Sequence, residues 1–320
     1  MYNKITLLGN AQDAGRPQVG CNRKCCKEAF KNSLLVRNPV SLGLHGDKFG
    51  IVETTKSLTN QLQMVENPEL SEIWLTHAHL GHIEGLGQFG REALNSKKIK
   101  LRCSQSVREY ILKHPIWKKL FDRKNLIFSD FGTNSVIPIE VPHRSKDFDT
   151  HALLFKGKNN ILFLPDHDSW SETLDFVGHN NPLDWFNHVE ANIVLLDGTF
   201  WDKMELADRN QENVPHPTVK ETLQLLGERR QKDPRIIFIH LNHTNPLHDK
   251  DRFFINVGTR DQYERHSLKD FLHSYLKLDP NDIFDEKDLI KQDIRVETIA
   301  RVNLCNEWAK EAIPKIVLER

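Results

Sequence analysis

Short apolar runs recur along the chain as far as residue 239. They are rich in Ile, Leu, Val and Phe and are bounded by Gly, Pro, Asn or Asp, a pattern typical of buried β-strands. Helical patterns separate only some of them, at Ile83–Leu94, Ser106–Leu112 and Thr218–Arg229. Many strands with few helices between them predict sheets covered by helices rather than a regular alternation of strand and helix. The predicted strands are Ile5–Leu8, Val40–Leu44, Phe49–Val52, Ile73–Leu75, Ile99–Leu101, Leu126–Phe128, Val136–Val141, Ala152–Phe155, Ile161–Leu164, Ile193–Leu196 and Ile236–Ile239.

The charges of the chain are balanced. Its 320 residues include 44 Lys and Arg and 44 Asp and Glu, so the formal net charge is zero. This balance argues against a strongly basic nucleic-acid-binding protein, and the apolar runs are too short to cross a bilayer. The opening MYNKITLLGN has no signal-peptide pattern, so we expect a cytoplasmic protein.

The pattern of the sequence changes near residue 256. Beyond Asp261 the chain is charged, poor in strand patterns and rich in helix-like stretches. We therefore expect two parts, a main domain over residues 1–255 and a helical C-terminal extension over residues 256–320. The extension carries no motif that indicates a chemical role.

Histidine is frequent, with 16 in the chain, and three of them lie within one short stretch. After the apolar run Ile73–Leu75 the sequence reads Thr-His77-Ala-His79-Leu-Gly81-His82. Two histidines separated by one residue in a turn can converge on one metal ion, and the third can reach a second ion nearby. The alternative is a polar turn that contains histidines by chance.

Three further strands end in potential metal ligands. His143 follows Val136–Val141, Asp166 follows the run that ends at Leu164, and His240 follows Ile236–Ile239. Active sites of layered α/β proteins collect where loops meet at one edge of the sheets. Four strand ends with ligands of the same kind therefore predict a metal site at that edge.

The order of these residues resembles the metallo-β-lactamase superfamily. The opening Leu-Gly9-Asn-Ala-Gln12-Asp13-Ala-Gly15-Arg-Pro17-Gln18-Val-Gly-Cys21 and the segment Phe238-Ile-His-Leu-Asn-His-Thr-Asn-Pro246 are similar to its pyrroloquinoline quinone biosynthesis protein B branch. The resemblance covers roughly residues 3–252 and implies an α/β fold, a four-layer αβ/βα sandwich with a metal site at one edge. It also implies a first metal held by His77, His79 and His143, and a second held by His82 and His240 with Asp166 bridging the two.

Gly81 departs from the superfamily pattern. The superfamily usually has Asp immediately before the third histidine, and glycine has no side chain to offer. We therefore expect the second site to have three ligands and to bind its metal weakly or stay empty. A single Zn²⁺ with three protein ligands and an open water position is still a competent catalytic arrangement. The proton-handling carboxylate would then come from Asp13, Asp166 or Asp168.

His216 stands in Val-Pro-His-Pro-Thr, directly before the predicted helix Thr218–Arg229. This position resembles that of the general-acid histidine in the tRNA-processing and phosphodiesterase branches of the superfamily, and it implies a proton donor for the leaving group. A histidine in a helix-capping loop is the alternative. Asp197, at the end of another strand, either orients site residues or is structural.

Three thiols lie close together in Cys21-Asn-Arg-Lys-Cys25-Cys26. In a chain without a signal peptide, close thiols bind metal more often than they form disulfides, and a structural zinc site needs a fourth ligand. His243 is the candidate, because the phosphodiesterase branch combines a short Cys cluster with a histidine just past the last catalytic one. The Cys spacing here differs from that branch, and free, partly buried thiols are the alternative.

Together these patterns predict a metal-dependent hydrolase, with zinc expected, that uses a metal-bound hydroxide on a small-molecule ester, amide or phosphodiester. We expect no nucleic-acid or membrane partner. Imidazole and carboxylate ligands also accept Fe or Mn. This leaves two alternatives open: a pyrroloquinoline quinone biosynthesis protein with oxidative, iron-type chemistry, and a non-catalytic metal-binding or carrier protein.

Overall fold

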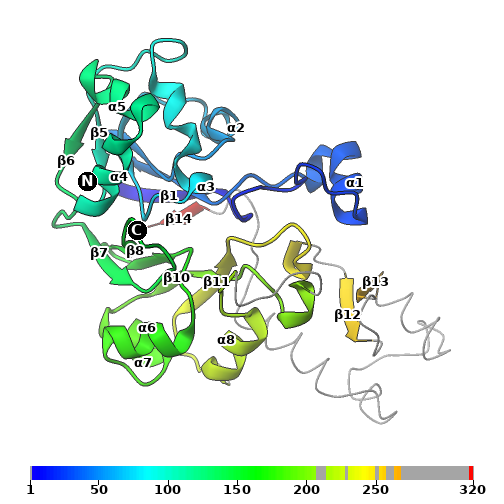
Figure 1. The fold of residues 1–320 in the computed structure, drawn as a ribbon. Helices are drawn as coiled ribbons and strands as arrows, with labels where there is room; N and C mark the ends of the chain where they lie inside the picture. The colour runs from blue at the N-terminus through cyan, green and yellow to red at the C-terminus, as the bar shows by residue number, and fades with distance from the viewer. Residues whose placement is uncertain are drawn as a thin grey trace, which may run out of the picture.

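In the computed structural model, two β-sheets pack face to face and helices cover their outer faces (Figure 1). The structure describes residues 2–206, 214–227 and 230–248, together with three C-terminal strands at 252–256, 263–267 and 317–319. This is the four-layer α/β sandwich that the sequence predicts. None of the helices in these ranges is long and apolar enough to span a bilayer.

The first sheet has seven strands in the order β14-β1-β2-β3-β4-β5-β6. The pairs β14–β1, β1–β2 and β2–β3 are antiparallel, whereas the pairs β3–β4, β4–β5 and β5–β6 are parallel. Four helices accompany this sheet: α2 (Leu58–Gln63), α3 (Leu80–Ile83), α4 (Gln105–Lys113) and α5 (Pro115–Asp122). The strands are β1 (Tyr2–Gly9), β2 (Ser41–Gly46), β3 (Phe49–Val52), β4 (Leu70–Trp74), β5 (Ile99–Arg102), β6 (Leu126–Ser129) and β14 (Val317–Glu319).

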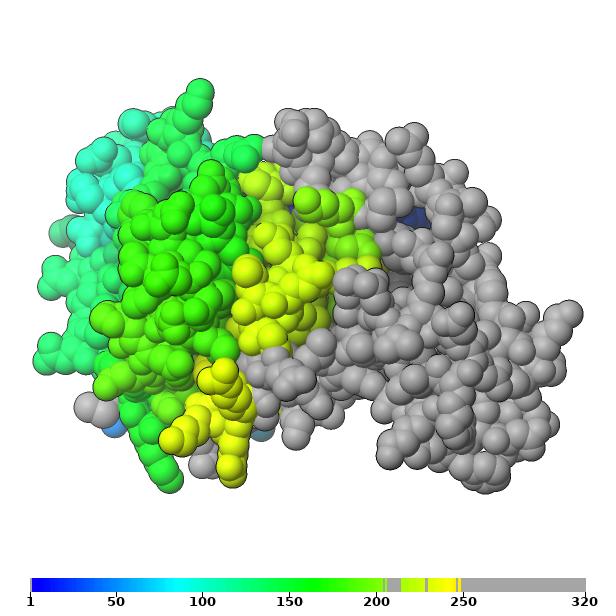
Figure 2. Space-filling view, turned by 90° about the horizontal axis from the view of Figure 1, so that it is seen from below, coloured from blue at the N-terminus to red at the C-terminus, as the bar shows by residue number. Residues whose placement is uncertain are grey.

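The second sheet has five strands in the order β11-β10-β9-β8-β7. Helices α6 (Trp170–Val177), α7 (Pro182–His188) and α8 (Val219–Leu226) cover its outer face. Figure 2 shows this side of the molecule, where the green surface of the α6 and α7 region adjoins the yellow-green surface of the α8 region. The strands are β7 (Val136–Val141), β8 (Thr150–Phe155), β9 (Ile161–Leu164), β10 (Ile193–Asp197) and β11 (Arg235–Ile239).

Strand β9 shows why the predicted strands read as continuous apolar runs. Its four residues are all buried, because the sheet is covered on both faces. Ile161 and Phe163 belong to the core between the two sheets, whereas Leu162 and Leu164 pack against the helices. Alternate side chains of a strand point to opposite faces, so each strand of this kind contributes to two core layers.

Local signals set the bounds of the helices in the second half. The Thr218 hydroxyl accepts a hydrogen bond from the Glu221 amide at the start of α8, and Gly227 ends this helix. The prediction for Ile83–Leu94 was wrong in type, because a 3₁₀ helix spans Glu84–Phe89. A Cβ at Gly85 would lie 2.3 Å from the Thr55 carbonyl oxygen, so this segment packs too closely on the neighbouring loop for an ordinary helical side chain.

The expected helical extension contains strands where the structure describes it. Strand β12 (Arg252–Asn256) pairs with β13 (Tyr263–Ser267), and β14 extends the first sheet by pairing antiparallel with β1. The described residues of the extension are therefore strands, at 263–267 and 317–319. The boundary proposed at residue 255 falls within β12 and stays a prediction, and the rest of the extension lies outside the described residues.

A candidate metal centre and a thiol cluster

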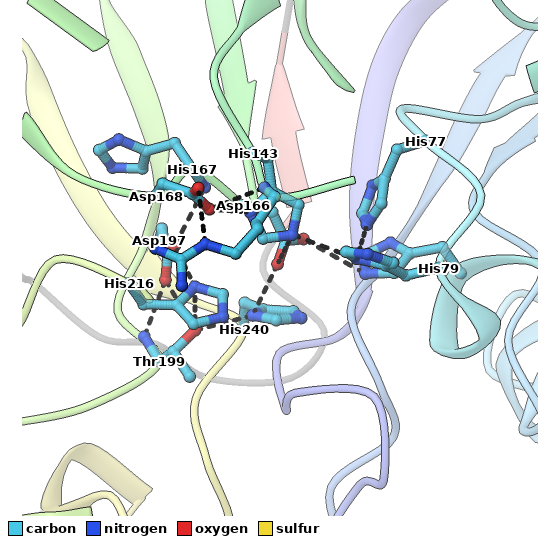
Figure 3. Close-up of polar contacts among 12 residues, drawn as sticks. His77, His79, His143, Asp166, His167, Asp168, Asp197, Thr199, His216 and His240 are labelled. Carbon is cyan, nitrogen blue, oxygen red and sulfur yellow. Dashed lines mark hydrogen bonds and ion pairs between the residues drawn. The ribbon is translucent and has the colours of Figure 1, made fainter. Parts of the chain in front are cut away.

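The predicted site residues come together at one edge of the sandwich, where strands of both sheets end. His77 and His79 follow β4, and His143 follows β7. Asp166 follows β9 and His240 follows β11. Figure 3 shows these side chains pointing toward one another from the two sheets. The convergence of strand ends is what the sequence pattern predicts.

His77, His79 and His143 form the first group. The Nδ1 atom of His79 lies 3.0 Å from Nε2 of His77 and 3.1 Å from Nε2 of His143. Tetrahedral zinc with Zn–N bonds of about 2.0–2.1 Å would place such nitrogens about 3.3 Å apart. Burial, followed by the neighbouring His143, lowers the pKa of His79 to about 4, and burial also lowers the pKa of His77. Neutral imidazoles offer the lone pairs that a metal ion requires.

Hydrogen bonds on the outer nitrogens fix the orientation of two of these rings. Nδ1 of His143 donates to Oδ1 of Asp168 at 3.0 Å. Nδ1 of His77 donates to the Thr76 hydroxyl at 2.9 Å, and that hydroxyl donates to Glu53 at 2.6 Å. When these two rings are neutral, Nε2 of each, which faces the other histidines, therefore carries the lone pair. Such partners are typical of metal-ligating histidines, so this group fits a metal ion.

His82, His240 and Asp13 form the second group, and Asp166 lies beside it. Nε2 of His82 lies 3.2 Å from Oδ2 of Asp166 and 3.3 Å from Oδ1 of Asp13. Nε2 of His240 lies 3.2 Å from the same Asp13 oxygen. The other oxygen of Asp166, Oδ1, lies 3.8 Å from Nε2 of His143 in the first group. Asp166 thus faces both groups, as its predicted bridging position requires.

The electrostatics of the second group favour a cation. Burial alone would raise the pKa of Asp166, but His240 and His82 hold it well below its usual range. Nδ1 of His240 donates to the Thr199 hydroxyl at 2.8 Å, and this hydroxyl donates to Asp197 at 2.7 Å. This arrangement turns Nε2 of His240 toward the Asp13 carboxylate, whose Oδ1 lies 3.2 Å away. A metal cation between these two atoms would take both of them as ligands.

The position of Asp13 changes the expectation of a three-ligand second site. A Cβ at Gly81 would lie 2.3 Å from Cγ and 2.5 Å from Oδ1 of Asp13. The carboxylate of the loop after β1 therefore lies where the side chain of residue 81 would begin. Of the three carboxylates considered as proton carriers, Asp13 and Asp166 face the second group, whereas Asp168 holds His143.

His216 lies beside both groups and pairs with Asp197. Its Nδ1 is 2.7 Å from Oδ2 of Asp197, and its ring centroid is 5.6 Å from those of His143 and His240. Burial would lower the pKa of His216, but the charge and hydrogen bond of Asp197 outweigh it and raise the pKa to about 9. The imidazolium form, which can donate a proton, is therefore favoured at neutral pH. The role of His216 as general acid stays a prediction.

The three thiols and His243 form a separate cluster. Nδ1 of His243 lies 3.8 Å from the Cys21 sulfur and 3.4 Å from those of Cys25 and Cys26, and the Cys25 and Cys26 sulfurs are 3.9 Å apart. A tetrahedral zinc site with Zn–S bonds of about 2.3 Å and Zn–N bonds of about 2.0–2.1 Å has S–S separations of about 3.8 Å and S–N separations of about 3.6 Å. None of these three thiols forms a disulfide with another cysteine that the structure describes. The geometry fits a structural zinc ion.

Two residues that support the ligands were missed in the sequence. Glu53 accepts hydrogen bonds from Thr76, and its Oε1 lies 3.5 Å from Nδ1 of His82. It directly follows β3, so the strand-end pattern that identified His143 and His240 could also have identified Glu53. Glu53 and His240 both have positive φ, 63° and 58°. Such backbone strain is typical of functional sites. Thr199 carried no comparable signal.

No protein-family model matches the chain. It is 25% identical over 295 residues to "Coenzyme PQQ synthesis protein B" of Pseudomonas syringae pv. syringae, covering 77% of this chain and 92% of that protein. It is 22% identical over 294 residues, with the same coverage, to the protein of that name from Acinetobacter baumannii strain AYE. A match to the "Octanoyltransferase" of Porphyromonas gingivalis has 21% identity over 264 residues and 77% of this chain, but spans only about half, 47%, of that relative.

Solved structures share the fold. The Zn(2+)-bound PqqB from Methylobacterium extorquens has a TM-score of 0.63 at 14% identity and covers 99% of this chain and 100% of that one. A diphosphatase from the PhnP family has a TM-score of 0.53 at 17% identity, covering 78% and 90%. The metallo-β-lactamase fold protein YhfI from Bacillus subtilis has a TM-score of 0.50 at 15% identity, covering 77% and 88%. The chain therefore has the metallo-β-lactamase fold.

Proposed function

We propose that this protein with a metallo-β-lactamase fold is a metal-dependent hydrolase. The observation that carries the proposal is the placement of two facing ligand groups, with Asp166 between them, beside the His216–Asp197 pair. His77, His79 and His143 would hold the first metal, and His82, Asp166 and His240 the second. We expect zinc at both positions and a structural zinc ion at Cys21, Cys25, Cys26 and His243.

A bound zinc ion would supply hydroxide at neutral pH by lowering the pKa of its water toward 7. The residues of the chain would do the rest. His216 lies against both groups, so it would donate its proton to the leaving group as the scissile bond breaks. Asp197 would keep His216 protonated and oriented through the 2.7 Å contact with Nδ1. The buried carboxylate of Asp166 and the partly exposed carboxylate of Asp13 would position the attacking water and accept its proton.

We propose a small-molecule ester, amide or phosphodiester as the substrate, and no nucleic-acid or membrane partner. The formal net charge of zero supports this choice, because nucleic-acid binding requires clustered Lys and Arg to contact phosphates. The shared fold with a diphosphatase supports hydrolysis. We expect the protein to act in the cytoplasm.

The test combines metal analysis with hydrolysis assays. Protein purified without added metal should contain zinc, and it should hydrolyse at least one substrate in a panel of generic phosphodiesters, lactones and esters. His79→Ala should lose the first-site metal and the activity. His188→Ala, at the exposed end of α7, should keep both. A wild-type protein that binds no metal dependent on His79, or that is as inert as His79→Ala on every substrate, would contradict the proposal.

A second candidate function is a step in pyrroloquinoline quinone biosynthesis. It is favoured by the two relatives named "Coenzyme PQQ synthesis protein B", whose similarity covers 77% of this chain. The proposed chemistry is then oxidation of a tyrosine-derived precursor with iron at the first group, because imidazole ligands accept iron as well as zinc. Stoichiometric iron and oxygen-dependent turnover would support this candidate over the hydrolase.

A further inference from the structure

One carboxylate reaches the second ligand group from a part of the chain far from the histidine motif. Asp13 lies in the loop between β1 and helix α1 (Lys24–Lys31). Its Oδ1 atom is 3.3 Å from Nε2 of His82 and 3.2 Å from Nε2 of His240. Asp13, His82 and His240 each offer one ligand atom that lies within 4.8 Å of the other two. Asp13 thus faces the same point in space as the two histidines.

The backbone holds Asp13 in place beside His240. The amide of Gln12 donates to the carbonyl of Leu241 at 2.9 Å, and the amide of Leu241 donates to the carbonyl of Asn10 at 2.8 Å. The residues flanking Asp13 and His240 therefore form a short parallel bridge. Because backbone hydrogen bonds join the two loops directly, the backbone beside Asp13 is held next to His240, and the Asp13 carboxylate lies within reach of that ring.

Glycine at position 81 leaves room for the Asp13 side chain. Gly81 lies in α3 between His79 and His82, and a Cβ there would lie 2.4 Å from Cβ and 2.3 Å from Cγ of Asp13. Separations under 3.0 Å do not occur between such atoms in real structures. A side chain at residue 81 and the Asp13 carboxylate therefore exclude each other.

We propose that Asp13 is the fourth ligand of the second metal site, supplied by the N-terminal loop in place of a side chain at position 81. The inference rests on the proposed metal centre and adds a ligand to it. It assigns a divalent cation, bound by two imidazoles and the carboxylates of Asp13 and Asp166, to a site for which the histidine motif alone provides three ligands. On this proposal the second site keeps its carboxylate ligand, which comes from Asp13 and not from position 81.

The experiment compares metal content and affinity in a small set of variants. Zinc per chain is measured by mass spectrometry after dialysis, and the affinity of the second site is measured by competition with a chromogenic chelator. Asp13→Gly should weaken second-site binding by at least about 100-fold, beyond the about 10–100-fold typical of losing a supporting residue. Asp13→Asn, which keeps the shape of the side chain, should also weaken metal binding at the second site.

Two further variants test the exchange between positions 13 and 81. Gly81→Ala removes no ligand but should weaken the second site, because its methyl group would displace Asp13. Gly87→Ala is the matched control, since a Cβ there meets nothing within 4 Å, and it should bind zinc as the wild type does. The double variant Asp13→Gly/Gly81→Asp moves the carboxylate to the helix, and it should regain most of the affinity lost in Asp13→Gly.

The outcomes separate this inference from the proposed function. Unchanged second-site affinity in both Asp13→Gly and Asp13→Asn would overturn the inference, while a first-site metal lost only in His79→Ala would leave the hydrolase proposal standing. Circular dichroism verifies that the double variant is folded. If the folded double variant binds zinc at the second site no better than Asp13→Gly, the proposal that a carboxylate at position 81 can replace the one at position 13 is overturned. A wild-type protein without any metal dependent on His79 would overturn both proposals.

Discussion

Replacing Asp168 tests whether an outer hydrogen bond controls metal affinity at the first group. The carboxylate accepts from Nδ1 of His143 at 3.0 Å and from the Arg144 amide at 2.9 Å, and its side chain is only 10% exposed. Losing a hydrogen bond to a charged group costs about 1.5–3 kcal/mol, which corresponds to about 10–150-fold in affinity. Losses of about 10–100-fold are typical when a partner of a ligating histidine is removed. For Asp168→Ala we therefore expect first-site zinc affinity to fall about 10–100-fold.

Chelator competition on the purified protein measures this loss, and the first-site metal is identified as the one missing from His79→Ala. Asp168→Asn keeps a neutral acceptor for His143, so its loss should be smaller, about 3–10-fold. Asp175→Ala, an exposed position in α6, is the control and should leave the affinity unchanged. If Asp168→Ala binds within about twofold of the wild type, His143 either is not a ligand or is not oriented by Asp168, and the reasoning fails.

Three other substitutions test the proton donor, the thiol cluster and the core. His216→Ala should lower kcat about 10²–10⁴-fold on a substrate with a poor leaving group and much less on a p-nitrophenyl substrate, with unchanged metal content; equal losses on both would argue against a proton donor. Cys26→Ala should lower Tm and remove one zinc ion per chain, whereas Cys103→Ala, a buried thiol outside the cluster, should keep that ion. Phe163→Ala empties a fully buried position between the sheets and should lower the free energy of unfolding by about 3–5 kcal/mol in urea titrations; a loss below about 1 kcal/mol would contradict the packing described.

The strands were predictable because the sandwich buries both faces of its sheets. A strand such as Ile161–Leu164 has no exposed face, so its sequence is apolar at every position. The same architecture places the residue after each strand at the sheet edge. His143, Asp166 and His240 could therefore be found from their position after a strand, before any contact between them was known.

The contribution of Asp13 could not be predicted in the same way. Its approach to residue 81 depends on how a loop without regular structure crosses a helix start, and no periodicity in the sequence describes that path. Gly81 therefore indicated a missing ligand, because the motif alone does not show what fills the space beside it. The 3₁₀ segment Glu84–Phe89 was missed for a related reason: its apolar spacing resembles a helix, but Gly85 packs against the Thr55 carbonyl oxygen.

The sequence separation of the ligands has a consequence for folding. His77 and His79 are two residues apart, but Asp13 and His240 are separated by 227 positions. Bringing such distant residues together requires a large entropic loss, and an unfolded chain does not present them as a site. A metal ion bound there would therefore add its binding free energy to the stability of the native state. Removing that ion should weaken the association of β1 with β11. The first site should be affected less, because its ligands His77, His79 and His143 lie much closer together in the sequence.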